Sequence, residues 1–104
     1  MKRFIIMNAD DNVATALEDC QKGETAIVYD QYKQEVVVLD CLDHITYGNK
    51  MALKDIYRND TILKYSLSIG TAVSNINKGK LVHVHNVKSN RIDIPEDIKR
   101  QIIE

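Results

Sequence analysis

Short apolar runs separated by polar residues and glycines set the hydrophobic pattern of this chain. Runs of this length, rich in β-branched residues, are typical of strands rather than helices. The pattern predicts strands over residues 2–8, 24–30, 34–40, 50–56, 61–67, 68–74 and 80–87. Many short strands at intervals of about ten residues favour an all-β barrel or a sandwich-like fold.

Details of the runs refine this prediction. The polar stretch after Asp30 suits the turn of a hairpin between 24–30 and 34–40, and the unbroken "VVVL" at 36–39 suggests a strand covered on both faces. Gly48 is the expected turn residue of the loop at 42–50. The sequence shows no convincing internal repeat.

Two segments have a helical pattern instead. In 10–23, apolar residues recur at the i, i+3, i+4, i+7 positions of one helical face, with Asp11 or Asn12 as the N-cap and Gly23 as the terminator; these apolar residues are Val13, Ala16, Leu17 and Cys20. In 94–103, Pro95 suits the first helical position. We therefore predict one mainly β domain over 1–104, with a short helix in its N-terminal half and another near its C-terminus.

Composition narrows the class of protein. Fourteen basic residues balance fifteen acidic ones, giving a net charge of −1, which argues against nucleic acid or an anionic membrane as the main partner. The apolar runs are too short to span a bilayer, and the N-terminus does not have the pattern of a signal peptide. Cys20 and Cys41 lack metal-type spacing, so we expect reduced thiols that fill the core of a cytoplasmic protein.

Two histidines in "VHVHN" are the first candidate site. If 80–87 is a strand, His83 and His85 share one face and could help to hold zinc, iron or manganese. Such a site needs a third ligand, for which the candidates are His44, Asp40, Asp43 and Asp55. Contact with a substrate or partner, or simple hydrogen bonding of exposed histidines, remain alternatives.

Lysines and a tyrosine are the second candidate. Lys50 and Lys54 share a face if 50–56 is a strand, and Lys64 precedes Tyr65. Lysine and tyrosine side chains can bind a carboxylate, or transfer protons if burial shifts their pKa values. The alternative is an ordinary solvated strand face. No glycine-rich phosphate loop and no nucleophile triad can be placed.

The stretch "YGNKMALKDIYRNDTILKYSLSIGTAVSNINKGKLVHVHN" resembles the N-terminal SAF domain of the altronate and galactarate dehydratase family. The family pattern runs Gly-His-Lys, Ala-Leu-x-Asp-Ile, Lys-Tyr-Gly, Ile-Gly-x-Ala and Val-His-x-His-Asn. Upstream, "DDNVATAL" resembles the family's Asp-Asn-Val-x-x-Ala-Leu. The resemblance covers about residues 3–90, leaves 91–104 as a C-terminal extension, and implies a β-clip fold.

Three positions depart from the family pattern. Asn49 stands where histidine is usual, Ser66 where glycine is expected, and Asn59 replaces a turn glycine, which asparagine can do because it tolerates positive φ. Because position 49 lacks the histidine, a role of this position as an acid, a base or a ligand is in doubt.

What the resemblance implies is a small subunit that assembles with a large catalytic subunit. The large subunit would carry most of the chemistry, which depends on a divalent metal, iron or manganese; no metal is expected in the isolated chain. The substrate would be a small acidic metabolite, a sugar acid, which loses a group β to its carboxylate. The resemblance implies catalytic duty for His83 and His85, and substrate binding by Lys50, Lys64, Tyr65 and Asn86. The alternatives are a sulfolactate sulfo-lyase small subunit and a non-catalytic SAF module that binds carbohydrates or acids.

Overall fold

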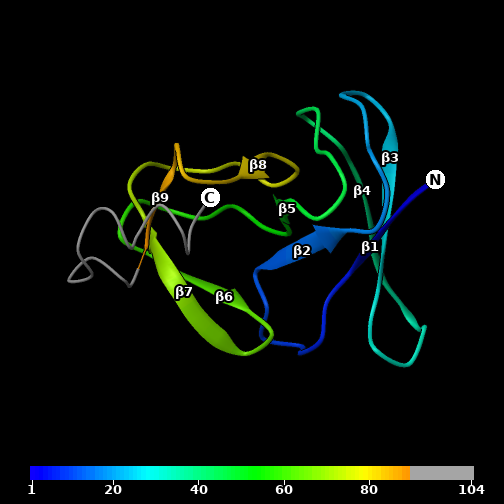
Figure 1. Ribbon diagram of the computed structural model, residues 1–104, viewed down its shortest axis with the longest axis horizontal. Coiled ribbons are helices and arrows are strands. Elements are labelled where there is room, and N and C mark those ends of the chain that lie inside the picture. The colour runs from blue at the N-terminus through cyan, green and yellow to red at the C-terminus, as the bar shows by residue number, and fades with distance from the viewer. Residues whose placement is uncertain (90–104) are drawn as a thin grey trace.

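Nine short strands in two sheets form the structure, a computed structural model that describes residues 1–89 (Figure 1). The strands are β1 (Lys2–Ile5), β2 (Val13–Ala16), β3 (Thr25–Tyr29), β4 (Glu35–Asp40), β5 (Lys50–Ala52), β6 (Thr61–Lys64), β7 (Leu67–Ala72), β8 (Leu81–Val82) and β9 (Val87–Ser89). A six-stranded sheet has the order β4-β3-β1-β2-β5-β8, and a three-stranded sheet has the order β6-β7-β9. The mainly β prediction is confirmed, while the helix predicted in 94–103 lies outside the described residues.

The hairpin predicted between 24–30 and 34–40 is present as β3 and β4. Its turn is closed by the Asp30 carboxylate, which accepts hydrogen bonds from the backbone N–H groups of Tyr32 and Gln34. β4 is an edge strand, and Val36 and Val38 are each 48% exposed, so the prediction of a strand covered on both faces is wrong. An apolar run alone does not distinguish a covered strand from an edge strand with one open face.

The helix predicted in 10–23 is also wrong. Val13–Ala16 forms β2, which pairs antiparallel with both β1 and β5. Val13, Ala14 and Ala16 are each 1% exposed, because the two faces of this central strand meet different parts of the core. The helical spacing therefore arose from a strand buried on both sides, and long-range pairing overrode the local pattern.

Three predicted strands contain turns instead. In 50–56, β5 ends at Ala52, so Lys54 does not share a strand face with Lys50. In 61–67, the chain reverses at Tyr65 and Ser66, so β6 and β7 form a two-residue hairpin. In 80–87, β8 ends at Val82, and residues 83–86 form a turn before β9. His83 and His85 therefore do not lie on a common strand face, and the geometric reason for pairing them is wrong.

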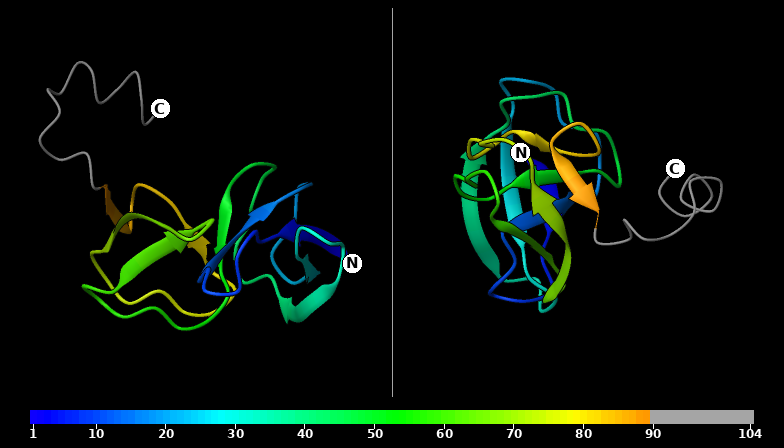
Figure 2. Two further views of the ribbon diagram at one scale, coloured as in Figure 1. Left: turned by 90° about the horizontal axis from the view of Figure 1, so that it is seen from below. Right: turned by 90° about the vertical axis from the view of Figure 1, so that its left-hand side faces the viewer.

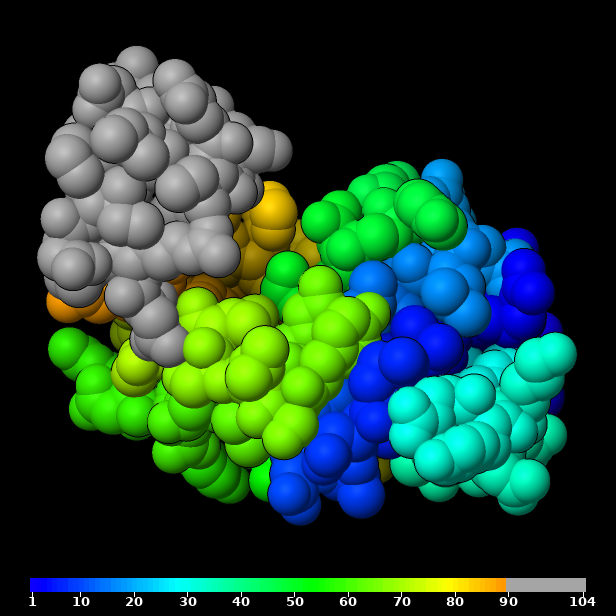
Figure 3. Space-filling model, turned by 60° about the horizontal axis from the view of Figure 1, so that its bottom comes forward, coloured from blue at the N-terminus to red at the C-terminus, as the bar shows by residue number. Residues whose placement is uncertain are grey.

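The core has two parts that meet at the six-stranded sheet. Alternate residues of β2 divide between them: Ala14 and Ala16 join a cluster with Phe4 and Met51, and Val13 joins a second cluster. The second cluster includes Ala52, Ile56, Ile62, Ala72, Ile76 and Val82. Figure 2 shows the β6–β7 hairpin and the β3–β4 hairpin at opposite ends of the molecule, and the space-filling view in Figure 3 shows the same separation on the surface. Within residues 1–89 no helix is long or apolar enough to cross a membrane.

A fourfold internal repeat links these elements, contrary to the expectation of none. The segments "ALEDCQKG", "CLDHITYG", "ALKDIYRN" and "AVSNINKG" occupy residues 16–23, 41–48, 52–59 and 72–79. In each, the first and fifth residues are buried, and the eighth has positive φ. The eighth residues are Gly23, Gly48, Asn59 and Gly79, so asparagine does take the conformation of a turn glycine at position 59.

The four copies pair reciprocally, the first with the second and the third with the fourth. The fifth residues exchange two backbone hydrogen bonds, between Cys20 and Ile45 and between Ile56 and Ile76. The eighth residue of each copy donates its N–H to the first residue of the paired copy, at 2.8–2.9 Å. These donor–acceptor pairs are Gly23–Cys41, Gly48–Ala16, Asn59–Ala72 and Gly79–Ala52.

Candidate functional site

A hollow of about 150 Å³ opens between the two sheets, where β5 and the turn at 83–86 face β7 and β9. Lys50 and His83 supply its charged and titratable groups. Its other lining residues are Ile69, Val84, Val87 and Ser89. The structure therefore brings together two of the predicted site residues, Lys50 and His83.

Lys50 is the most perturbed basic group at this hollow. Burial, and then the positive charge of Lys64, hold the pKa of Lys50 below its usual value of 10.5. The ion pairs of the described residues join Lys2 to Glu24, Arg3 to Glu18 and Lys80 to Asp43, so none of them neutralises Lys50 or Lys64. Two cations that repel each other, and that form no ion pair within residues 1–89, favour binding of an anion.

The β6–β7 turn presents Lys64 and Tyr65. The Lys64 ammonium lies 5.0 Å from the centre of the Tyr65 ring, within the range of a cation–π contact. Tyr65 and Ser66 have φ values of 55° and 68°, the left-handed pair that a two-residue hairpin turn requires. Ser66 thus occupies a position where glycine would be free of strain.

Asp11 and Asn12, predicted as helix caps, hold this turn in place instead. The Asn12 amide donates to the Thr61 carbonyl at 2.8 Å and accepts from the Leu63 N–H at 2.7 Å. The Asp11 carboxylate accepts from the Ser66 N–H at 2.7 Å. Both residues are nearly buried. Sequence reasoning missed this role because the partners lie about fifty residues away along the chain.

Asn86 organises the turn that carries the histidines. Its Oδ1 accepts the His83 N–H at 2.9 Å, and its Nδ2 donates to the Leu81 carbonyl at 2.8 Å. The Asn86 N–H donates to the His83 carbonyl, which closes the turn. The side chain of Asn86 is 7% exposed and both ends of its amide are engaged, so its visible role is to place His83.

His85 lines a different hollow, of about 330 Å³, on the side of the fourth repeat copy. Lys80 and Asp43 lie in this hollow and form an ion pair at 3.6 Å. Ser74, Asn75 and Asn77 add further polar groups. The two histidines therefore line separate hollows on either side of one turn.

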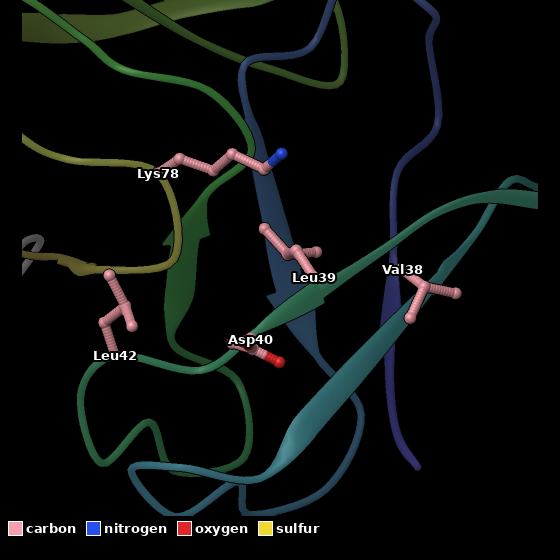
Figure 4. A pocket seen from close by; sticks show the side chains of 5 residues that line it. All are labelled: Val38, Leu39, Asp40, Leu42 and Lys78. Carbon is pink, nitrogen blue, oxygen red and sulfur yellow. The ribbon is translucent and has the colours of Figure 1, made fainter.

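A third hollow, of about 410 Å³, lies where the end of β4 meets the turn of the fourth copy (Figure 4). Its lining includes Asp40 and Lys78 together with Val38, Leu39 and Leu42. The chain passes so close here that a Cβ on Gly79 would lie 2.5 Å from the Asp40 carbonyl oxygen. Glycine at 79 is thus required both by its positive φ and by this approach.

Metal ligands do not converge in the described residues. Asp43 and Asp55, two of the third-ligand candidates, accept the backbone N–H groups of Leu81 and Lys78. No group of three His, Cys, Asp or Glu side chains able to hold a metal ion occurs within residues 1–89.

The two cysteines are free thiols in the core, as the sequence indicated. Both have no exposed surface. Burial, and then the neighbouring Cys20, raise the pKa of Cys41 to about 12. A protonated buried thiol is a poor nucleophile, so this pair fills the core rather than the site.

Comparisons with known proteins bear on the whole described chain. The family model for the altronate/galactarate dehydratase SAF domain matches residues 2–90. An altronate dehydratase of Bacillus subtilis is 44% identical over 94 residues, and one of Escherichia coli is 34% identical over 94 residues. The α subunit of a (2R)-sulfolactate sulfo-lyase of Chromohalobacter salexigens is 34% identical over 89 residues.

These relatives differ in how much of their length is matched. The aligned residues make up 90% of this chain but 18% of each altronate dehydratase. For the sulfo-lyase α subunit they make up 85% of this chain and 95% of the relative.

Proposed function

Because the chain belongs to the altronate/galactarate dehydratase SAF-domain family, we propose that it is the small subunit of a lyase complex. In this proposal it works in the cytoplasm and assembles with a large catalytic subunit. Its substrate is a small acidic metabolite, a sugar acid of the altronate or galactarate type. The chain contributes polar residues to an active site that the large subunit mostly builds.

The share of each relative that is matched supports this proposal. The chain is matched over almost all of a protein named as one subunit of a sulfo-lyase, and over about a fifth of each altronate dehydratase. A domain that is a subunit in one relative and a fraction of a larger enzyme in another fits a role as an enzyme component.

The hollow that Lys50 and His83 line offers this chain's contribution to the elimination reaction. Loss of a group β to a carboxylate requires removal of the adjacent proton and stabilisation of the negative charge that develops. Lys50 and Lys64 offer that positive charge, and Tyr65 lies beside Lys64. His83 and His85 orient the substrate or move a proton, and Asn86 places His83. A divalent iron or manganese ion held by the large subunit would supply Lewis-acid chemistry.

A sulfolactate sulfo-lyase small subunit is the second candidate. It is favoured by the near-complete coverage of the sulfo-lyase α subunit, whereas the sugar-acid assignment is favoured by the higher identity to an altronate dehydratase. The third possibility is a SAF module that binds carbohydrates or acids without a catalytic partner.

One assay separates these functions. The purified chain, and its complex with any large dehydratase-like chain encoded by a neighbouring gene, are each supplied with altronate, galactarate or sulfolactate, with ferrous iron or manganese added. We expect turnover only from the complex, with altronate or galactarate as substrate. Turnover of sulfolactate alone would select the second candidate, and turnover by the isolated chain would refute the subunit role.

Assembly is tested separately by size exclusion. Co-expression with the large subunit should give one complex under reducing conditions. If both chains fold but elute apart at micromolar concentration, the free-standing binding module becomes the better description.

A further inference from the structure

We propose that the Thr15 hydroxyl is the third member of an anion site formed with Lys50 and Lys64, and that this site binds the carboxylate of the acidic substrate. The identity of the substrate rests on the function proposed above. The binding of a carboxylate rests on the structure of this chain alone.

Strand register places Thr15 beside Lys50. Thr15 of β2 is the direct antiparallel partner of Lys50 of β5. Directly opposed residues of an antiparallel pair point to the same face, with Cβ atoms about 5 Å apart. On its other side, Lys50 is the direct partner of Val82 in β8, the strand that leads into the turn at His83. Thr15 is therefore the strand neighbour of Lys50, which lines the hollow.

The Thr15 hydroxyl is a buried polar group that lacks a partner. Among the described residues it is the one buried side-chain nitrogen or oxygen atom with no hydrogen-bond partner. Thr15 as a whole is partly buried, whereas the polar residues that are buried as a whole, Asp11, Asn12 and Asn86, all form hydrogen bonds. A buried hydroxyl left unpaired costs about 1–3 kcal/mol, so an unsatisfied one next to a hollow calls for an explanation.

The neighbouring charges indicate the missing partner. Lys50 and Lys64 can only donate hydrogen bonds, and a threonine hydroxyl can donate one as well. A carboxylate accepts through two oxygens and carries the opposite charge, so it would satisfy all three groups together. A second cation or an uncharged hydroxyl would leave the repulsion between Lys50 and Lys64 uncompensated.

Because the Thr15 hydroxyl is buried, a ligand reaches it only if neighbouring groups move. Thr15 Oγ1 has less than 1 Å² exposed. Lys50, its directly opposed neighbour, is only partly buried and has a flexible four-carbon stem. Movement of the Lys50 side chain towards a bound anion is the route of access that the proposal requires.

The test is a titration of the isolated chain with sodium D-gluconate, a stable sugar acid, against D-sorbitol at constant ionic strength. NMR signals of Thr15, Lys50 and Lys64 are followed. We expect gluconate, but not sorbitol, to shift these signals. Thr15→Val should weaken gluconate binding about tenfold, the loss of one hydrogen bond to a charged group. Thr15→Ser, which keeps the hydroxyl, should stay within about threefold of the parent.

Thr25→Val is the matched control. Thr25 is a half-buried strand threonine of β3, three strands away from β5 in the sheet order, so its removal should leave gluconate binding unchanged. Thermal unfolding of each variant verifies folding. If Thr15→Val only raises the melting temperature and binds gluconate as the parent does, the hydroxyl is an unsatisfied core group and the proposal is wrong.

A second readout separates this proposal from the function. In the active complex, Thr15→Val should raise KM about tenfold and change kcat less. An inactive complex combined with gluconate binding that depends on Thr15 would overturn the lyase assignment and leave the anion site standing. An active complex in which Thr15→Val leaves KM unchanged would overturn the anion site and leave the lyase assignment standing.

Discussion

Asp55 and Asn75 each accept a hydrogen bond from a backbone N–H in the turn that contains the other. Asp55 Oδ1 accepts the Lys78 N–H, and Asn75 Oδ1 accepts the Arg58 N–H, both at 2.9 Å. They are the fourth residues of the third and fourth repeat copies. Asp19, the fourth residue of the first copy, accepts the Tyr47 N–H in the same way at 2.8 Å. The second copy has His44 at this position, and among the described residues no hydrogen bond joins it to Lys22, the equivalent donor.

His44→Asn should therefore stabilise the protein. An asparagine can accept the Lys22 N–H as Asn75 accepts that of Arg58, adding a hydrogen bond worth about 1 kcal/mol. Chemical denaturation measures the free energy of unfolding. Asn75→Ala is the control and should destabilise by a similar amount, and equal stability of His44→Asn and the parent would contradict the equivalence of the four positions.

Asn12→Ala should be among the most destabilising single changes. Asn12 is 5% exposed, and its side chain bonds both the Thr61 carbonyl and the Leu63 N–H. Loss of these bonds leaves buried backbone groups unpaired and should cost about 2–4 kcal/mol. Denaturation measures the cost, and Asn8→Ala, at an exposed loop contact, should change stability much less.

Ser66→Gly should raise stability by about 0.5 kcal/mol. Ser66 has φ of 68°, which glycine adopts without strain, although part of the gain is offset by the greater freedom of glycine in the unfolded chain. Ser68→Gly is the matched control in β7, where φ is not positive, and it should destabilise. Loss of stability in both variants would mean that the turn does not carry strain at position 66.

Lys50→Met should stabilise the fold at neutral pH while weakening anion binding. Burial and Lys64 hold the pKa of Lys50 below 10.5, so the unfolded state binds the proton more tightly than the folded one. The protonated lysine thus costs stability at neutral pH, and this cost is relieved as pH rises towards 10.5. Melting temperatures of the parent and Lys50→Met should converge over that range, with Lys54→Met as an exposed control.

His83→Ala and His85→Ala should each lower turnover of the complex by at least about tenfold, the low side of what a positioned acid–base group contributes. Because the two side chains line different hollows, their effects should add in the double variant. Partner binding, measured by size exclusion, should be nearly intact. A double variant with parental turnover would falsify the catalytic role, and stoichiometric tight metal in the isolated chain would refute the expectation that it holds none.

Local signals in the sequence predicted local structure well. The β3–β4 hairpin and the turn at Gly48 depend on residues close together in the chain, and both are present. β2 was missed because its partners, β1 and β5, lie elsewhere in the sequence, and because a strand buried on both faces can imitate a helical stripe. No local feature of the sequence distinguishes a strand buried on both faces from an amphipathic helix here.

The candidate site was predictable only in part for the same reason. The resemblance named Lys50 and Lys64, and the structure brings their charges together. It could not show that Asn86 bends the chain between the histidines, or that Thr15 faces Lys50. The repeat was hidden because its four copies share burial and a turn, and three of them a capping side chain, with no residue identical in all four.

Reciprocal pairing of the copies makes each half of this fold equivalent to a two-fold symmetric dimer joined into one chain. In a true homodimer every substitution appears twice, so a charged site cannot arise on one side without its duplicate. Here each copy can change alone. The residues that follow the turn at the position of Lys50 are Thr25, Thr61 and Leu81 in the other three copies, all uncharged. Covalent linkage thus permits a symmetric scaffold to carry a lysine in one copy, where strict two-fold symmetry would have imposed its duplicate.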